Sequence, residues 1–350
     1  MLKRGRIPVF YTDMHRLHAT DQAHLEGYPL AVDEVPARAE IILQALEAAQ
    51  LGEITAPVDQ GLEPILAVHP ADFLEFLQSA YAESARQPKG SRLFPDTFAT
   101  RHTGSKPRTF PGLKGYYAFD PYSPILAGTW DAAYWSAQCA LAATAAVRAG
   151  EQVAYALCRP PGHHAAADLY GGYCYLNNAA IAARFLHNNT VSSGQRTAIA
   201  ILDIDYHHGN GTQVIFYNDP SVLFCSLHAD PDHEYPYYWG RADERGEGAG
   251  AGCNQNWPLP PGVDDATYLA ALGEAVAAIR AFAPQYLLVS AGFDIFADDP
   301  VGGFSLTTAG IHQIALQIAA LDMPTVIIQE GGYLQEHLGE NAVAFLQTFL

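Results

Sequence analysis

The sequence predicts an α/β fold in which a mostly parallel, multi-stranded sheet carries helices on both of its faces. Apolar runs of β type alternate with alanine-rich runs of helical period over roughly two hundred residues, an alternation typical of parallel sheets. The run 198–202 is apolar throughout, which indicates a strand buried on both faces. No composition break, linker or repeat follows residue 130, so we expect residues 1–350 to form a single domain.

Apolar runs predict strands over residues 7–11, 152–158, 197–205, 222–227, 285–294 and 325–329. Helical periodicity predicts helices over residues 37–50, 63–82, 129–150, 177–189, 265–283 and 307–321. The second of these helices should break at Pro70, because proline does not fit the interior of a helix.

Residues 86–128 differ from the rest of the chain, because they are rich in Pro, Gly, Thr and Arg and show no clear period. We expect a long loop insertion here, and loops of this length in compact domains are usually functional or disordered. The aromatic residues of this segment favour order, and they are Phe110, Tyr116, Tyr117, Phe119 and Tyr122.

The charge and cysteine content limit the classes of partner. Asp and Glu number 37 against 19 Lys and Arg, a formal charge of −18, which argues against nucleic acid and favours a cationic substrate. The cysteines number five and show no CxxC pair, so we expect neither a disulfide framework nor a structural zinc knuckle. The N-terminus lacks the pattern of a secretion signal, and no apolar run is long enough for a membrane span. We therefore expect a cytoplasmic protein without a membrane partner.

Four of the expected strands end in chemically active side chains. In open parallel sheets, ligands bind beyond the carboxyl ends of the strands, so equivalent ends contribute to one site. The four tails read RPPGHH, DIDYHHGNG, AGFD and EGGY. Their reactive side chains belong to His163, His164, Asp203, Asp205, His207, Asn210, Asp294 and Tyr333. One such tail would be weak support, but four at equivalent positions indicate an active site.

Asp205, His207 and Asp294 together predict a divalent metal site. Side chains two residues apart on a strand share a face, so Asp205 and His207 converge if the extended conformation continues. The two carboxylates would balance the charge of zinc and leave coordination positions open for water and substrate. The cysteines near these strands are left out of the ligand set, because buried free cysteine is common in protein cores.

The tandem histidines His163 and His164 predict acid–base chemistry, with Asp203 and Asn210 as their natural partners. An Asp partner favours a protonated imidazole, and a neutral Asn partner favours it far less. One histidine would thus stay cationic while the other accepts a proton near neutral pH. Tyr333 follows a flexible Gly-Gly pair, from which its phenol could swing toward a developing oxyanion, although an ordinary turn with a packed ring is the alternative.

These motifs resemble those of the arginase–deacetylase superfamily, in particular the bacterial acetylpolyamine amidohydrolases and the histone deacetylases. The segments RPPGHH, GGYCYLNNAAIAA, ILDIDYHHGNGTQ, SLHAD, SAGFD and EGGY match in the family's order, and the similarity runs from about Phe10 to the C-terminus. The resemblance implies the arginase–deacetylase fold and a zinc-dependent hydrolase that removes acetyl groups from amines.

The resemblance also implies a role for each matching residue. The zinc ligands would be Asp205, His207 and Asp294. His164, paired with Asn210, would be the general base and then the general acid. His163 would be its electrostatic partner, oriented by Asp203. Tyr333 would donate a hydrogen bond to the substrate carbonyl oxygen.

Further positions are implied around the zinc. The acyl tunnel would be lined by Gly172, Tyr173 and Tyr235, and Arg38 falls where the family keeps an arginine in an inner channel beneath the site. Family members also bind a monovalent cation near the zinc. The oxygens for potassium would come here from Asp203, Asp205, His207, Ser226 and Leu227.

The substrate is less sharply implied. GYY at 115–117 and HADPDHEYPYYWG at 228–240 resemble the polyamine branch, in which the long loop carries glutamates that contact the cationic amine and helps to form a homodimer. Here Tyr122 stands at the position of one such glutamate, with Asp120 nearby. Val301 stands at the tunnel rim, where lysine deacetylases prefer an apolar residue. We expect substrate contacts from Tyr122, Asp120 and Val301.

We therefore expect a zinc-dependent amidohydrolase of N-acetylpolyamines or related small acetylated amines, working as a homodimer. A histone deacetylase-like hydrolase of acyl-lysine is the alternative within the class, and iron could replace zinc in the cell. A non-catalytic binding protein of the same fold is a remote alternative, because it would not need the proton-transfer pair. A two-metal ureohydrolase is disfavoured, because Gly209 stands where a second-metal carboxylate would be needed.

Overall fold

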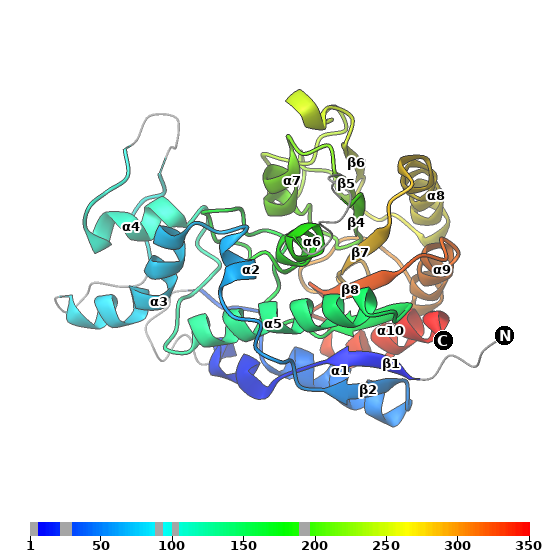
Figure 1. The fold of residues 1–350 in the computed structure, drawn as a ribbon, viewed down its shortest axis with the longest axis horizontal. Coiled ribbons are helices and arrows are strands. Elements are labelled where there is room, and N and C mark those ends of the chain that lie inside the picture. Colours follow the sequence, from blue (N-terminus) through cyan, green and yellow to red (C-terminus); the bar gives the residue numbers. More distant parts are fainter. Residues whose placement is uncertain (1–5, 22–29, 88–93, 100–104, 189–196) are drawn as a thin grey trace.

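The computed structural model describes residues 6–21, 30–87, 94–99, 105–188 and 197–350, which contain one sheet of eight strands in the order β2-β1-β3-β8-β7-β4-β5-β6 (Figure 1). Every pair of neighbouring strands is parallel. The strands are β1 (Ile7–Phe10), β2 (Gly52–Thr55), β3 (Val153–Ala156), β4 (Ile199–Asp203), β5 (Val222–Ala229), β6 (Asn254–Leu259), β7 (Tyr286–Ala291) and β8 (Thr325–Gln329). The predicted parallel α/β fold is confirmed.

Helices connect most of the strands. The α-helices are α1 (Ala37–Ala48), α2 (Glu63–Leu66), α3 (Ala71–Arg86), α4 (Phe110–Tyr117), α5 (Thr129–Arg148), α6 (Asn178–Asn188), α7 (Asn210–Phe216), α8 (Asp265–Phe282), α9 (Thr308–Ala319) and α10 (Gln335–Leu346). Short 3-10 helices are η1 (Asp13–Leu17), η3 (Gly248–Gly250) and η4 (Gln347–Phe349). The predicted break at Pro70 separates α2 from α3, and Pro70 itself is extended at the N-cap of α3.

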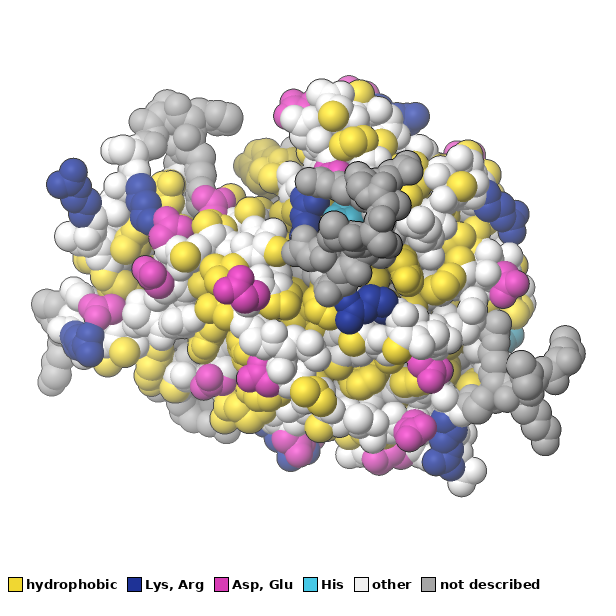
Figure 2. Space-filling view, viewed as in Figure 1, with side chains coloured by type: hydrophobic (Ala, Val, Ile, Leu, Met, Phe, Trp, Pro, Cys, Tyr) yellow, Lys and Arg dark blue, Asp and Glu magenta, His cyan; other side chains and the backbone are white. Residues whose placement is uncertain are grey.

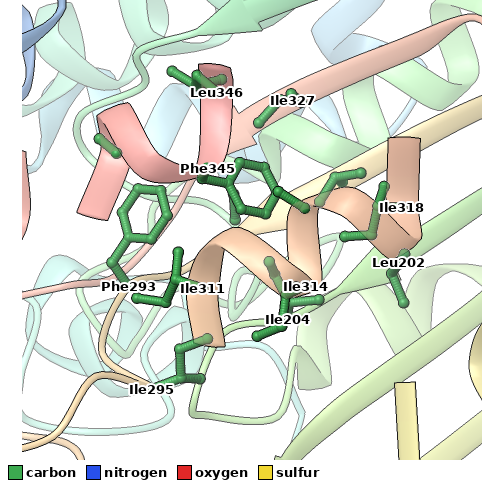
Figure 3. Close-up of a cluster of buried hydrophobic side chains, with 14 of the residues drawn as sticks. Leu202, Ile204, Phe293, Ile295, Ile311, Ile314, Ile318, Ile327, Phe345 and Leu346 are labelled. Atoms are coloured by element: carbon green, nitrogen blue, oxygen red, sulfur yellow. The ribbon is translucent and has the colours of Figure 1, made fainter. Parts of the chain in front are cut away.

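The sheet is covered on both faces, and alternate residues of β4 show how. Ala200 and Leu202 pack into a cluster with α1, α8, α9 and α10, whereas Ile199 and Ile201 pack into a second cluster with α5, α6 and α7. Figure 3 shows part of the first cluster, in which α9 and α10 bring their apolar side chains together above the sheet. An all-apolar strand can therefore be buried on both sides.

Two expectations are corrected. The segment 86–128 contains a helix, α4, which the sequence did not predict because Pro111, Gly112 and Gly115 weaken its period. Phe110 and Tyr117 of this helix are buried against α3, so tertiary packing stabilises it. The parts of the predicted loop at 88–93 and 100–104 lie outside the described residues. The edge strands β2 and β6 were also missed, because GEIT and NQNWPL lack an apolar run.

The order of the strands places the four chemically active tails at one edge of the sheet. The strands β3, β8, β7 and β4 are direct neighbours at its centre, although they lie far apart in the sequence. Since all four are parallel, their carboxyl ends point the same way. The tails after them are therefore brought together above the centre of the sheet.

The surface agrees with the acidic composition. On the face shown in Figure 2, Lys and Arg side chains are scattered singly and form no broad basic patch. Among the described helices, none combines the length and the apolar character that a membrane crossing requires.

Candidate active site

A pocket of about 400 Å³ opens above the central strands. It contains side chains from three of the four tails, namely His164, His207 and Tyr333. The remaining lining comes from Ala31, Asp33, Tyr122, Gly172, Tyr173, Glu234, Tyr235, Tyr237, Pro300, Val301 and Gly302. Asp33, Glu234 and Tyr237 are lining residues that sequence reasoning did not single out. The strand-end pattern gave no signal for them, because they belong to loops beside the sheet.

At the bottom of the pocket, Asp205, His207 and Asp294 form a compact cluster whose potential ligand atoms all lie within 4.8 Å of one another. His207 Nδ1 lies 3.1 Å from Asp294 Oδ2 and 3.4 Å from Asp205 Oδ1. Both carboxylates are buried. The extended strand ends at Asp203, and a bend carries Asp205 and His207 onward to meet Asp294.

Backbone amides fix the two carboxylates. Asp205 Oδ2 accepts a hydrogen bond of 2.8 Å from the amide of Gly331, and Asp294 Oδ1 accepts one of 3.0 Å from the amide of Tyr206. A Cβ at Gly331 would lie 2.5 Å from Asp294 Oδ2 and 2.6 Å from Asp205 Oδ2. Only glycine lets the backbone approach the carboxylate pair so closely, so the Gly-Gly pair before Tyr333 serves close packing.

The electrostatics of this cluster fit a divalent cation. Burial and the negative charge of Asp205 raise the pKa of Asp294. Burial opposes a positive charge on His207, but hydrogen bonds and charge from both aspartates outweigh it and raise the pKa of His207 to about 10. The two buried carboxylates of Asp205 and Asp294 thus favour a positive charge between them, and Nδ1 of His207 lies beside the same carboxylate oxygens. A metal with oxygen and nitrogen ligands, such as zinc, matches this donor set.

The tandem histidines have different partners. His163 Nδ1 lies 3.0 Å from Asp203 Oδ2, and His163 Nε2 lies 3.8 Å from Asp205 Oδ1. Burial alone would lower the pKa of His163, but the charges of Asp205 and Asp203 raise it to about 10. A protonated imidazole is therefore held behind the pocket.

His164 faces a neutral partner instead. Its Nδ1 lies 2.7 Å from Asn210 Oδ1, and burial together with the charges of His163 and His207 lowers its pKa well below the usual value. Since an amide oxygen can only accept, Nδ1 carries the proton and Nε2 keeps a free lone pair. The neutral His164 can therefore accept a proton, while the neighbouring His163 carries the positive charge.

Tyr333 lines the pocket beside the metal-ligand cluster and is largely buried. The guanidinium group of Arg38 lies 4.4 Å from the centre of its ring. Arg38 also donates to the carbonyl oxygens of Gly332 at 2.6 Å and Glu330 at 2.8 Å, and it pairs with Glu34 at 2.9 Å. Arg38 thus lies beneath the pocket rather than in its lining.

The walls above the cluster are aromatic. The ring of Tyr235 lies 5.0 Å from the ring of His164, and the ring of Tyr173 lies 5.7 Å from that of Tyr333, measured between centroids. Gly172 has a φ of 55°, and a Cβ there would lie 2.4 Å from His164 Cδ2, so glycine keeps the wall close to the histidine.

Asp120 does not line the pocket, in contrast to its predicted role as a substrate contact. Its Oδ2 accepts a hydrogen bond of 2.7 Å from the amide of Gly172 and a second one from the hydroxyl of Tyr235. Asp120 is buried, and burial raises its pKa to about 6. It therefore supports the two wall residues from behind. Tyr122 and Val301, the other predicted contacts, do line the pocket.

The residues suggested for potassium lie at the end of β4, in the bend that follows it and on the neighbouring strand β5. Asp203 at the end of β4 is the register partner of Ser226 on β5, and both are fully buried, as is Leu227. Ser226 Oγ lies 2.8 Å from His228 Nδ1.

Two buried acids that the sequence did not single out hold the active tails in place. Glu330 Oε2 accepts from the amides of Gly162 at 2.6 Å and His163 at 3.1 Å, and burial raises its pKa to about 7. Glu330 also lies near His163 and Cys174, but Oε2 already accepts from two backbone amides and Oε1 accepts from the hydroxyl of Ser290 at 3.2 Å. Asp299 accepts from the backbone amide of Tyr333. Glu330 is the first residue of the EGGY motif and Asp299 follows the SAGFD motif, but only the fold reveals their partners.

Comparisons with known proteins place this geometry in a family. A family profile described as Histone deacetylase domain matches residues 32–349. Acetylpolyamine amidohydrolase 1 of Pseudomonas aeruginosa is 46% identical over 342 residues, which cover 97% of both chains. Acetylpolyamine amidohydrolase of Mycoplana ramosa is 38% identical over 340 residues, covering 97% of this chain and 98% of that protein.

Solved structures agree with the sequence comparison. The crystal structure of acetylpolyamine aminohydrolase from Burkholderia pseudomallei superimposes with a TM-score of 0.91 at 40% identity, covering 98% of both chains. The HD domain of HDA15 superimposes with a TM-score of 0.80 at 26% identity, covering 99% of this chain and 90% of that one. With a matched family profile and relatives of this similarity over nearly the whole chain, the protein belongs to the histone deacetylase domain family.

Proposed function

We propose that this protein is a zinc-dependent amidohydrolase that removes acetyl groups from small acetylated amines, with N-acetylpolyamines as the substrate class. The observation that carries the proposal is the pocket in which a neutral His164 and the phenol of Tyr333 lie beside the cluster of Asp205, His207 and Asp294, with a cationic His163 behind it.

The roles of the side chains follow from their charges and positions. Bound zinc would be held by Asp205, His207 and Asp294, and it supplies Lewis acidity for the carbonyl and lowers the pKa of bound water. His164 Nε2 accepts a proton from the attacking water and returns it to the leaving amine nitrogen. The positive charge of His163 and the hydroxyl of Tyr333 stabilise the negative charge that develops on the carbonyl oxygen. Potassium between Asp203 and Ser226 is part of the proposal.

The mouth of the pocket supports a cationic substrate. Asp33 and Glu234 are the acidic residues among its described lining, which contains neither Lys nor Arg. Glu234 is held in place, because Oε1 accepts from the amide of Tyr235 at 2.9 Å and Oε2 accepts from the hydroxyl of Tyr206 at 3.3 Å. Tyrosine rings around a carboxylate favour an ammonium group, such as the free end of an acetylated diamine.

A hydrolase of acyl-lysine is the second candidate, and Val301 favours it, because an apolar rim suits an uncharged peptide segment. A panel of substrates on the zinc-loaded protein separates the two. We expect kcat/KM for N-acetylputrescine, N-acetylcadaverine and N-acetylspermidine to exceed that for an acetyl-lysine peptide. The reverse order would favour the second candidate, and no hydrolysis of any of them would contradict the proposal.

The contribution of Glu234 to the selection of a cationic substrate can be measured separately. Glu234→Gln should lower kcat/KM for N-acetylcadaverine but not for the uncharged analogue N-hexylacetamide, because only the first has an ammonium group. Glu53→Gln is a matched control, since it removes the same charge from an exposed position on β2. An equal loss for both substrates in Glu234→Gln would show that Glu234 supports the wall and does not select charge.

We also propose a homodimer in a reducing, cytoplasmic setting. The cysteines Cys139, Cys158, Cys174 and Cys225 are free and buried, which fits a reducing compartment. Tyr122, which is 43% exposed beside the pocket mouth, suits a subunit contact that narrows the entrance.

A further inference from the structure

The carboxylate of Asp299 connects two parts of the active-site pocket through backbone amides. Its Oδ2 accepts from the amides of Tyr333 at 2.7 Å and Leu334 at 2.9 Å. Its Oδ1 accepts from the amide of Val301 at 3.1 Å. Asp299 is only 5% exposed and lies outside the pocket lining, so it would not touch substrate or metal.

Asp299 and Arg38 hold opposite groups of the same turn. Arg38 donates to the carbonyl oxygens of Glu330 and Gly332, and Asp299 accepts from the two amides that follow, those of Tyr333 and Leu334. Two carbonyl oxygens before the phenol and two amides at and after it are thereby matched with a charged partner of the right sign. The backbone that carries the ring of Tyr333 is therefore held in place, although two glycines precede it.

We propose that Asp299 is a positioning residue that sets the phenol of Tyr333 against the pocket wall at Val301. The inference rests on the proposed function, in which the hydroxyl of Tyr333 binds the carbonyl oxygen. A hydrogen-bond donor stabilises a developing charge only if it is already in place, and a misplacement of about 1 Å can cost roughly 100-fold in rate. Asp299 therefore acts through Tyr333 and not on the substrate.

Substitutions of Asp299 should reduce kcat and leave KM nearly unchanged. We expect Asp299→Ala to lower kcat about 10- to 100-fold. Asp299→Asn should have an intermediate effect. Its single side-chain oxygen can accept either from the amide of Val301 or from the amides of Tyr333 and Leu334, but not from both sets. Zinc content should stay near the parental level, since the hydrogen bonds of Asp299 go to backbone amides and to none of the proposed ligands. Asp265→Ala is the matched control, because its carboxylate also anchors a backbone amide, that of Thr307 at 2.9 Å, but outside the pocket.

A double-mutant cycle shows whether Asp299 acts through Tyr333. Tyr333→Phe alone should lower kcat about 100- to 1,000-fold while fold and zinc are kept, because one oxyanion donor is lost. Adding Asp299→Ala to Tyr333→Phe should cause little further loss, because there is no hydroxyl left to position. Multiplication of the two losses in the double variant, or a kcat of Asp299→Ala within about twofold of the parent, would overturn the inference.

Amide hydrogen exchange keeps the inference separate from the proposed function. Asp299→Ala and Asp299→Asn should speed exchange at Val301, Tyr333 and Leu334 but not at Thr307, and this readout needs no activity. Unchanged exchange at Tyr333 and Leu334 would contradict the inference even if the enzyme is a deacetylase. If the parent protein hydrolyses none of the acetylated amines, the proposed function fails. In that case the hydrogen-exchange measurement still shows whether Asp299 holds the backbone of Tyr333.

Discussion

His163 and His164 are adjacent in the sequence, and their ring centroids are only 4.0 Å apart, yet their pKa values move in opposite directions. The difference comes from the neighbouring charges: Asp205 and Asp203 raise the pKa of His163, whereas the positive charges of His163 and His207 add to burial in lowering the pKa of His164, whose own hydrogen-bond partner, Asn210, is neutral. The burial that both share cannot explain the difference, because it disfavours the charged form of either ring.

His164→Ala should therefore be the more damaging of the two substitutions. We expect a loss of about 100- to 10,000-fold in kcat with zinc still bound, because a proton-transfer group is removed and no ligand is lost. His163→Ala should cost less, since His163 contributes charge. Single-turnover rates of both variants, with His337→Ala at a half-buried position outside the pocket as control, provide the comparison. The opposite ranking would show that base and electrostatic partner have been exchanged.

Asp205→Ala and Asp294→Ala should each abolish zinc binding together with activity. Each removes one of three proposed protein ligands and leaves the other two too weak to hold the ion. Elemental analysis of the purified variants measures the metal directly and also distinguishes zinc from iron. Asp232→Ala, an exposed carboxylate outside the pocket, is the control. Near-stoichiometric metal in either ligand variant would remove that residue from the site.

At the scale of elements, the turn after β8 combines three tasks within a few residues. Glu330 holds the amides of Gly162 and His163, Gly331 gives its amide to Asp205, and Tyr333 enters the pocket. The turn thus ties three of the four tails together. Its glycine is needed for space, since a side chain there would meet both carboxylates.

Gly331→Ala should reduce zinc content and activity, because the new Cβ would lie 2.5 Å from an oxygen of Asp294 and must push one carboxylate aside. Gly273→Ala in α8 is a matched control, because a Cβ there meets nothing within 4 Å. Removing glycine from a helix interior usually stabilises a protein by about 0.5–1 kcal/mol, so this control should melt at or slightly above the parental temperature. Full zinc occupancy in Gly331→Ala would show that the turn has more room than the structure indicates.

The helices and strands also show where prediction from the hydrophobic periodicity of the sequence succeeds and where it fails. The strands β4, β7 and β8 each contain an apolar run and were predicted, because burial on both faces requires such a run. The edge strand β6, NQNWPL, and the helix α4, FPGLKGYY, were missed. Each depends on partners from elsewhere in the fold, namely β5 for β6 and α3 for α4.

At the scale of the whole molecule, the proposed dimer would restrict which substrates can enter. We expect light scattering at micromolar concentration to give the mass of two chains, with the segment around Tyr116–Tyr122 at the contact. Turnover of acetyl-lysine within a folded protein should be slow, because a narrowed entrance excludes large substrates. A monomer in the scattering measurement, or brisk turnover of the folded protein, would count against this arrangement.

The sequence by itself determined the parallel α/β fold and the four tails that meet above the central strands. These features are local, because a buried strand must be apolar and reactive side chains after it interrupt the pattern. It also pointed to the metal-ligand set Asp205, His207 and Asp294, through the spacing of two residues and the balance of charge.

Only the tertiary structure decided which distant groups complete the site. The sheet order places β8 between β3 and β7, so Glu330 and Asp299 come to hold the amides of tails that are remote in the sequence. It also moved Asp120 from the predicted pocket lining to a position behind Gly172, and it brought Glu234 into the lining. Hydrogen bonds between loops depend on the order of the strands in the sheet, and the local hydrophobic periodicity of the sequence carries no information about that order.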